Sequence, residues 1–200
     1  MKPHMKRIII GISGASGVIY GIRALQALKA MADIETHLIF SPSAKRTVVE
    51  ETEWTVAQVE ALADVLHTHG DIGASIASGS FRTAGMLVAP CSIKTLSGIV
   101  HSYNDNLLTR AADVCLKERR PLVLMVRETP LHLGHLEMMA QAVRYGAVIL
   151  PPVPAFYSKP QSLDDIVDHS VGKALDLFDI EHPLLKRWKE EPAVPPGAGA

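Results

Sequence analysis

Lys6-Arg7-Ile8-Ile9-Ile10 leads directly into Gly11-Ile12-Ser13-Gly14-Ala15-Ser16-Gly17, after which a helical pattern begins. The apolar run is typical of a parallel strand that is buried on both faces. The glycines allow backbone N–H groups to approach an anion at the start of the helix, and Ser13 and Ser16 add hydroxyl donors. The stretch therefore predicts a strand, a turn and a helix around a nucleotide-type ligand. The alternative is a tight turn that needs glycine for packing alone.

The same stretch is a poor match to the standard NAD-binding fingerprint. Its glycines do not follow the G-x-G-x-x-G spacing of that motif. Glu35 lies near the distance expected of an acidic ribose ligand, but Thr36 and His37 follow it and weaken the match. We therefore expect a nucleotide-type ligand that is bound without this fingerprint.

Length and charge limit the classes of protein that fit this chain. Its 200 residues suffice for one domain with a sizeable core. The 20 Lys and Arg residues are balanced by 21 Asp and Glu residues, which argues against a nucleic-acid-binding surface. Apolar runs are too short for a membrane span, and residues 1–5 are not followed by the apolar segment of a signal peptide. We expect a cytoplasmic protein that binds neither nucleic acid nor membranes.

Strand-like apolar runs alternate with helical patterns along the chain. We expect strands at residues 6–12, 35–40, 86–90, 121–126 and 147–150, and helices near residues 17–31, 43–51, 55–66, 105–118, 133–145 and 163–178. This order predicts an α/β fold, a single-domain Rossmann-like or flavodoxin-like three-layer sandwich with a parallel sheet. Residues 1–189 form the expected domain, and residues 190–200 a flexible tail rich in Pro and Gly.

Ligands of open parallel sheets bind at the carboxyl ends of the strands. The loops expected to carry the chemistry are residues 11–17, Ser41, residues 91–95, Arg127-Glu128 and residues 151–157.

The two cysteines, Cys91 and Cys115, do not form a CxxC pair, so neither a disulfide framework nor a zinc site is indicated. Cys115 lies in an apparent helix and is expected to be a packing residue. Cys91 follows a predicted strand and therefore lies where ligands gather. Because no general base stands near it in the sequence, we favour a lining role over a nucleophilic one.

Five motifs occur together in an order that characterises one family. They are Gly11-Ile12-Ser13-Gly14-Ala15-Ser16-Gly17, Pro90-Cys91-Ser92-Ile93-Lys94-Thr95-Leu96, Arg110-Ala111-Ala112-Asp113-Val114 with Leu116-Lys117-Glu118, Arg127-Glu128-Thr129-Pro130-Leu131, and Pro154-Ala155-Phe156-Tyr157. On these motifs the chain resembles the UbiX-type flavin prenyltransferases over about residues 6 to 188. Within that family it looks most like the members once regarded as one component of phenolic acid decarboxylases, a likeness that includes Ser78-Gly79-Ser80-Phe81-Arg82-Thr83.

The resemblance implies a metal-independent transfer of a dimethylallyl group from dimethylallyl phosphate to reduced FMN, first at flavin N5 and then by ring closure at C6. The product, prenylated FMN, would serve a separate UbiD-type decarboxylase. The resemblance further implies a homododecamer with its sites at contacts between subunits. The sequence leaves open whether the donor is a monophosphate or a diphosphate.

The resemblance also assigns roles to individual residues. FMN would be held by Gly14, Ala15, Ser16, Ser41, Ser92, Ile93, Lys94, Thr95 and Arg127. Tyr157 and Lys173 would hold the dimethylallyl phosphate. Arg110, Lys117 and Glu128 match further polar positions of the family's active site, and Glu51 matches the acid near flavin N5.

The chemistry of these side chains fits the reaction. An allylic phosphate leaves as an anion, so cations and hydrogen-bond donors must surround it. Arg110 and Lys117 are seven residues apart on one predicted helix and therefore share a face, which can instead be an ordinary solvated face. Arg127 ends a predicted buried strand, where Glu128 is either its structural ion partner or a proton donor to the leaving phosphate. Glu51 would take the proton released from N5.

Lys173 stands where many close relatives carry Arg. Lysine keeps the charge but lacks the planar pair of donors that arginine offers to a phosphate. The alternative interpretation is an ordinary exposed helix lysine. Tyr157 can likewise be a packing aromatic with its hydroxyl at the surface.

Two other motifs resemble metal sites. Asp164-Asp165-Ile166-Val167-Asp168 spells the DDxxD signature of magnesium-dependent isoprenoid synthases, but it occurs once and follows Ser162, which favours a helix N-cap. His132-Leu133-Gly134-His135 has a metal-like spacing without the HExxH order, which favours a helix start. We therefore expect no metal.

Two other functions remain open from the sequence. One is an FMN-dependent decarboxylase of peptidyl cysteines, although those proteins carry Pro-Ala-Ser-Ala-Asn-Thr where this chain has Pro90-Cys91-Ser92-Ile93-Lys94-Thr95. The other is a non-catalytic flavin carrier subunit of a decarboxylase. A carrier would have to stay bound to the decarboxylase, whereas an enzyme need only have supplied the cofactor.

Overall fold

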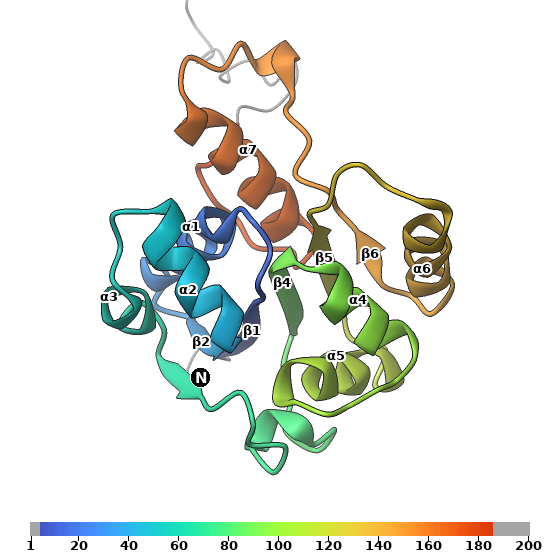
Figure 1. Ribbon diagram of the computed structural model, residues 1–200. Helices are drawn as coiled ribbons and strands as arrows, with labels where there is room; N and C mark the ends of the chain where they lie inside the picture. The colour runs from blue at the N-terminus through green and yellow to red at the C-terminus, as the bar shows by residue number, and fades with distance from the viewer. Residues whose placement is uncertain (1–4, 186–200) are drawn as a thin grey trace, which may run out of the picture.

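A parallel sheet forms the centre of the molecule (Figure 1). The computed structural model describes residues 5–185, and the predicted tail at residues 190–200 lies outside them. Within the described part the sheet has six strands in the order β3-β2-β1-β4-β5-β6. They are β1 (Lys6–Ile12), β2 (Ile34–Phe40), β3 (Val65–His67), β4 (Gly85–Cys91), β5 (Leu122–Val126) and β6 (Val148–Ile149). Every neighbouring pair is parallel, which confirms the predicted α/β class.

Helices cover both faces of the sheet and complete a three-layer sandwich (Figure 1). One face is covered by α1 (Val18–Lys29), α2 (Pro42–Glu51), α3 (Val56–Glu60) and α7 (Leu163–Asp176). The other face is covered by α4 (Ile93–Val100), α5 (Leu107–Lys117), α6 (Leu133–Arg144) and the short 3-10 helix η1 (Ser75–Ala77). A second 3-10 helix, η2 (Phe156–Ser158), precedes α7.

β1 lies inside the sheet because its side chains are apolar on both faces. Ile8 and Ile10 pack into the core beneath α1 and α7, whereas Ile9 packs into the core beneath α4 and α5. β1 pairs with β2 on one side and with β4 on the other, so the chain crosses over in opposite directions from this strand. The carboxyl ends of β1 and β4 are therefore the point at which such sheets bind ligands.

The helix expected at residues 55–66 is shorter than the sequence pattern predicted. α3 ends at Glu60, and β3 begins at Val65. Asp64 causes the change of direction: its carboxylate accepts the backbone N–H of Thr36 at 2.7 Å and the Thr36 hydroxyl at 2.8 Å. These bonds hold the segment against β2, so pairing at the sheet edge overrides the helical pattern.

The sequence pattern also missed α4, which was expected as a loop. Its eight residues include Gly98 and several β-branched side chains, and these give weak helix propensity. Packing compensates, because Leu96, Ile99 and Val100 are buried in the core beside β4. The consequence for the site is that the residues after β4 begin a helix.

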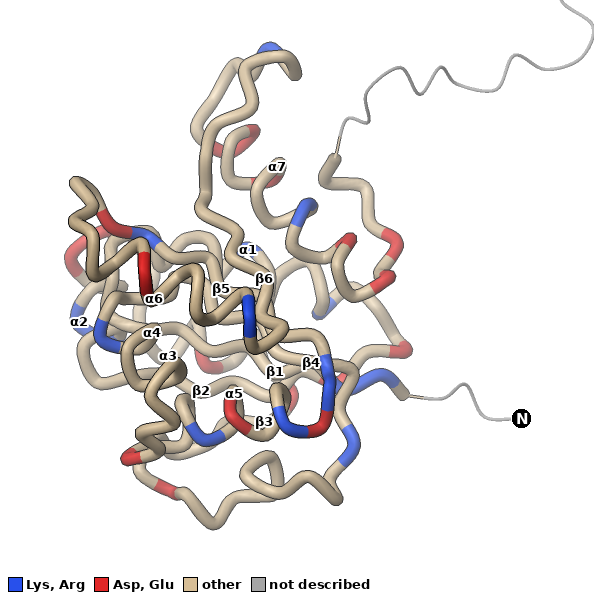
Figure 2. The backbone as a smooth tube through the Cα atoms, turned by 90° about the vertical axis from the view of Figure 1, so that its right-hand side faces the viewer, with Lys and Arg blue, Asp and Glu red and all other residues tan. Residues whose placement is uncertain are grey.

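The surface carries both signs of charge. In Figure 2 the acidic and basic residues are interspersed along the backbone, in keeping with a formal net charge of −1. Across residues 5–185, no helix has the length and hydropathy needed to cross a membrane.

Candidate active site

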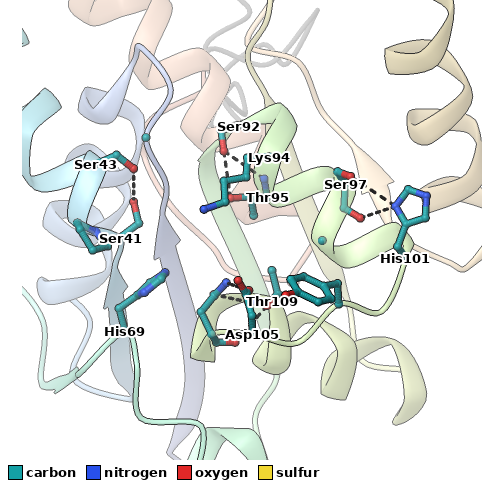
Figure 3. Close-up of a pocket in the computed structure, with 15 residues that line it drawn as sticks. Ser41, Ser43, His69, Ser92, Lys94, Thr95, Ser97, His101, Asp105 and Thr109 are labelled. Carbon is teal, nitrogen blue, oxygen red and sulfur yellow. Dashed lines mark hydrogen bonds between the residues drawn. The ribbon is translucent and has the colours of Figure 1, made fainter.

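A cleft of about 700 Å³ opens at the carboxyl ends of β1, β2 and β4. Five of the residues expected to hold FMN line it: Gly14, Ser41, Ser92, Lys94 and Thr95. Figure 3 shows Ser41 and Ser43 on one side of the cleft, facing Ser92, Lys94 and Thr95 on the other. The structure thus brings together loops that lie about fifty residues apart in the sequence.

The N-termini of α2, α4 and α5 all face this cleft. Ser41 caps α2 by accepting the Ala44 N–H at 3.1 Å, and Ser92 caps α4 by accepting the Thr95 N–H at 3.2 Å. Asn106 caps α5 in the same way. Asp105 brings a negative charge to the α5 side of the cleft. Helix N-termini carry partial positive charge and Lys94 adds a full one, so the side formed by α2 and α4 suits an anion such as a phosphate group.

Two residues of the turn after β1 shape this cleft without offering it a side-chain donor. A Cβ atom on Gly14 would lie 2.3 Å from the Ser43 hydroxyl oxygen, so only glycine fits where the turn passes the start of α2. Ser13 is buried, donates to the Pro90 carbonyl at 2.9 Å and accepts the Ser92 N–H at 2.8 Å. The expected donor Ser13 therefore ties the β1 and β4 loops together, which corrects the sequence interpretation.

A second cleft, of about 640 Å³, lies on the other side of the same turn. Ser16, Glu51 and Arg127 line it together with a largely apolar wall formed by Ile19, Tyr20, Trp54, Pro152, Leu163, Ile166 and Val167. Burial raises the pKa of the Tyr20 hydroxyl, and the nearby positive charge of Arg127 partly offsets that rise. Glu53 and Asp164 also line it, so the cleft combines three acids and one cation with an apolar wall and suits a ligand with both a hydrocarbon part and a charged part.

Glu51 occupies the position at which the sequence predicted an anionic ligand. Its Oε2 accepts the backbone N–H of Gly17 at 2.8 Å, at the N-cap of α1. This N–H is therefore engaged by a carboxylate of the chain itself. The helix N-termini that line the first cleft are those of α2, α4 and α5.

The two residues expected to bind the donor phosphate lie near each other, outside both clefts. Tyr157 in η2 places its hydroxyl 3.0 Å from Nε2 of His169 on α7. Lys173 lies one turn further along α7, half exposed, with its ammonium 3.9 Å from Asp176. Burial lowers the pKa of His169, and the charge of Lys173 lowers it further, which places the ammonium close to the imidazole.

Arg110 and Lys117 do not reach these clefts within one chain. The Arg110 guanidinium donates to the Ala77 carbonyl at 3.2 Å and to Asp113 at 3.0 Å. Lys117 pairs with Glu118. Arg110 is therefore held by its own chain, whereas Lys117 lies on a solvated part of the helix.

Glu128 follows β5 and is exposed, and its carboxylate accepts the backbone N–H of Thr129 at 3.0 Å. In the described part of the chain no salt bridge joins it to Arg127. The interpretation of the two as a structural ion pair is therefore wrong.

Ala15 and Ile93, the remaining residues expected to hold FMN, lie next to residues of the clefts. Ala15 lies in the turn after β1, and Ile93 is the first residue of α4.

The cysteines are buried, and both metal-like motifs lie at helix N-caps. Cys91 and Cys115 are fully buried, and burial raises the pKa of both thiols, that of Cys115 to about 12, so neither is a thiolate nucleophile. Cys91 belongs to the core, which corrects its expected lining role. Ser162 and Asp165 form a reciprocal cap on α7, and His132 caps α6. Within residues 5–185 no group of three potential metal ligands comes together.

The sequence analysis missed several residues of the first cleft. His69, Tyr103, Asp105, Asn106 and Thr109 also line it. Figure 3 shows His69, Asp105 and Thr109 below Ser41 and Ser92 in this view. Asn106 carried a usable signal, because an asparagine directly before an amphipathic helix is a preferred N-cap. His69 carried none, since its place depends on how the chain returns from β3.

Comparisons with known proteins agree with this arrangement. The model of the flavoprotein family matches residues 2–175. The flavin prenyltransferase UbiX of Escherichia coli K12 is 64% identical over 187 residues, which cover 92% of this chain and 99% of that protein. The crystal structure of AnUbiX in complex with FMN and dimethylallyl pyrophosphate matches with a TM-score of 0.90 at 48% identity, over 94% of this chain and 99% of the other.

A second solved structure extends the comparison. The dodecameric FMN-dependent UbiX-like decarboxylase of Escherichia coli O157:H7 matches with a TM-score of 0.90 at 51% identity, over 92% of this chain and 99% of the other. Sequence and structure thus match the same group of proteins along nearly the whole chain. The chain belongs to the flavoprotein family and, within it, to the UbiX flavin prenyltransferases.

Proposed function

We propose that the protein transfers a dimethylallyl group from dimethylallyl phosphate to reduced FMN, forming a bond first to N5 and then to C6 of the flavin. The observation that best supports this function is the pair of clefts on either side of the turn after β1. One is polar and lies at helix N-termini, and the other has an apolar wall beside Arg127 and three acids, Glu51, Glu53 and Asp164. A phosphate-bearing acceptor and a five-carbon allylic group need these two environments side by side.

The residues of the first cleft fit the phosphate end of FMN. Ser41, Ser92, Thr95 and Lys94 combine hydroxyl donors, helix N-termini and a cation, and Gly14 leaves room for close approach of the backbone. Ser16 and Arg127 would hold the ring end at the second cleft, with Ala15 and Ile93 contributing from the same loops. Reduced FMN supplies the electron-rich ring nitrogen and carbon that take up the allylic group.

Glu51 is the proposed proton acceptor at N5. The Gly17 N–H binds one of its two carboxylate oxygens and so fixes the orientation of the group. A carboxylate accepts several hydrogen bonds, so Glu51 keeps the capacity to receive a proton from a ligand in the same cleft. Its role is that of a general base of fixed position.

The leaving phosphate needs positive charge and a proton. Arg127 lies at the apolar cleft, and Lys173 with Tyr157 supplies an ammonium and a hydroxyl near α7. Glu128, next to Arg127, is the proposed proton donor, because a carboxyl group beside a phosphate dianion is favoured in its acid form. The monophosphate is the proposed donor.

Arg110 and Lys117 enter the site only in an oligomer. Both lie away from the clefts of their own chain. Apolar side chains are exposed on α6 and in the segment before η2, among them Leu133, Leu136 and Val153. Such surfaces mark contacts between chains. We propose a homododecamer, as in the solved UbiX-like relative, in which a neighbouring copy contributes Arg110 and Lys117.

Prenylated FMN would then pass to a UbiD-type decarboxylase. The two free thiols fit a reducing compartment such as the cytoplasm. To separate an enzyme from a flavin carrier, the protein is removed by filtration after reaction, and the flavin is added to the cofactor-free decarboxylase. Activation without the protein supports the transferase. Activation only while the protein stays in the mixture supports the carrier.

A further inference from the structure

His169 lies between the two residues proposed to bind the donor phosphate. Its Nε2 is 3.0 Å from the Tyr157 hydroxyl oxygen, and the two rings meet edge to face with centroids 5.7 Å apart. It also lies one helical turn before Lys173, on the same face of α7. An ionisable imidazole is thus in contact with one proposed phosphate ligand and adjacent to the other.

We propose that His169 is a positioning residue that sets the direction of the Tyr157 hydroxyl hydrogen and thereby controls how tightly the donor phosphate binds. The inference rests on the proposed function, because it takes Tyr157 and Lys173 as the donor-phosphate ligands. It adds a residue that does not itself touch the phosphate.

The direction of the hydrogen bond depends on the state of His169 Nε2. When Nε2 carries no hydrogen, it accepts the Tyr157 O–H, and the single hydrogen of the hydroxyl is directed at the imidazole. When Nε2 carries a hydrogen, it donates to the Tyr157 oxygen, and the hydroxyl hydrogen can point to a phosphate oxygen. The imidazolium permits only this second arrangement. Protonation of His169 therefore favours the geometry that binds a phosphate.

The surroundings of His169 allow a bound phosphate to change its protonation state. Burial and the charge of Lys173 lower the pKa of His169, so the neutral form predominates at neutral pH. A phosphate dianion beside Lys173 opposes the ammonium charge and favours the imidazolium. Binding of the donor should therefore be coupled to uptake of a proton.

Three other charged groups lie near His169, and both acids among them bind other partners. Lys159, Asp165 and Asp168 line a small cleft of about 220 Å³ together with His169. Asp168 binds Arg23 of α1 through both carboxylate oxygens, at 2.5 and 3.1 Å. Asp165 accepts backbone N–H groups at the start of α7. The positive charge of Lys173 adds to burial in lowering the pKa of His169.

The test compares wild type with His169→Gln, whose amide donates and accepts at every pH. The KM for dimethylallyl phosphate is measured between about pH 6 and pH 8.5 with reduced FMN saturating. The donor ionises identically in both samples, so the ratio of the two KM values isolates His169. The variant's KM should exceed that of wild type about tenfold at the low end and approach it at the high end. Maximal kcat and FMN affinity should be unchanged.

A second comparison separates positioning from direct contact. In the Tyr157→Phe background, His169→Gln should no longer produce a pH-dependent KM ratio, because the hydroxyl through which it acts is gone. A ratio that stays constant with pH in the Tyr157-containing protein, or one that remains pH-dependent in the Tyr157→Phe background, overturns the inference. Formation of prenylated FMN by wild type in the same assays checks the proposed function independently.

Discussion

The Glu51 carboxylate accepts the backbone N–H of Gly17 at 2.8 Å. This bond places an acid at the N-terminus of α1, where the partial positive charge of the helix favours an anion. Ser16 and Arg127 line the same cleft as Glu51. The turn after β1 therefore fixes a carboxylate in a cleft that also contains a cation, while Gly14 of the same turn lines the cleft at the helix N-termini.

Glu51→Gln tests the proposed general base. The amide oxygen can still accept the Gly17 N–H, but the side chain can no longer take a proton, so kcat should fall about 10²-fold or more. FMN affinity should change little. Glu50→Gln, on the same helix and exposed, is the matched control and should behave as wild type. Equal turnover of Glu51→Gln and the control would remove Glu51 from the chemistry.

Glu128→Gln separates binding from proton donation. If Glu128 protonates the departing phosphate, single-turnover prenyl transfer should slow about 10²-fold with FMN and donor both saturating. FMN binding should survive, because Glu128 lines neither cleft. The rate of prenyl transfer is measured by rapid mixing under anaerobic conditions. A rate within a factor of about two of wild type would show that the proton comes from elsewhere.

Lys94→Met tests the assignment of the first cleft to the FMN phosphate. Loss of a charged hydrogen bond should weaken FMN binding about tenfold or more. Riboflavin, which lacks the phosphate, is the matched ligand control, and its affinity should be nearly the same for variant and wild type. Fluorescence titration gives, for each flavin, the ratio of its dissociation constants for the variant and for wild type. An equal loss for FMN and riboflavin would place the phosphate outside this cleft.

Lys173 is tested with two substitutions. Lys173→Ala should raise the KM for dimethylallyl phosphate about tenfold, since a charged hydrogen bond contributes roughly 1.5–3 kcal/mol. Lys173→Arg keeps the charge and should retain more function, although the longer fork has to fit a site that holds lysine. FMN affinity should be unaffected in both. Donor titrations that are identical for alanine, arginine and wild type would identify Lys173 as a surface charge.

The sequence predicts the central part of this fold and loses accuracy toward its edges. The isoleucine run of β1 predicts a strand without tertiary information, because a continuous apolar run of this length is typical of a parallel strand buried on both faces. β3 and α4 could not be predicted in this way. The hydrogen bond of Asp64 to Thr36 determines where β3 begins, and the core contacts of Leu96 stabilise α4, so both elements depend on distant parts of the chain.

The site shows the same division. Ser41 and Ser92 were predictable, because each follows a strand of a parallel sheet and so lies at the same edge. The separation of Arg110 from Arg127 within one chain and the contact of Tyr157 with His169 were not, because neither helix periodicity nor motif spacing encodes how helices and loops are placed around the sheet.

Mass spectrometry of the flavin after anaerobic incubation of the protein with excess reduced FMN and dimethylallyl phosphate tests the transferase activity itself. The flavin should be heavier by one C5H8 unit, in molar excess over the protein and with a yield unchanged by EDTA. The diphosphate, offered in a parallel sample, should react more slowly than the monophosphate. Recovery of unmodified FMN alone from folded protein with either donor would show that the protein is not a flavin prenyltransferase.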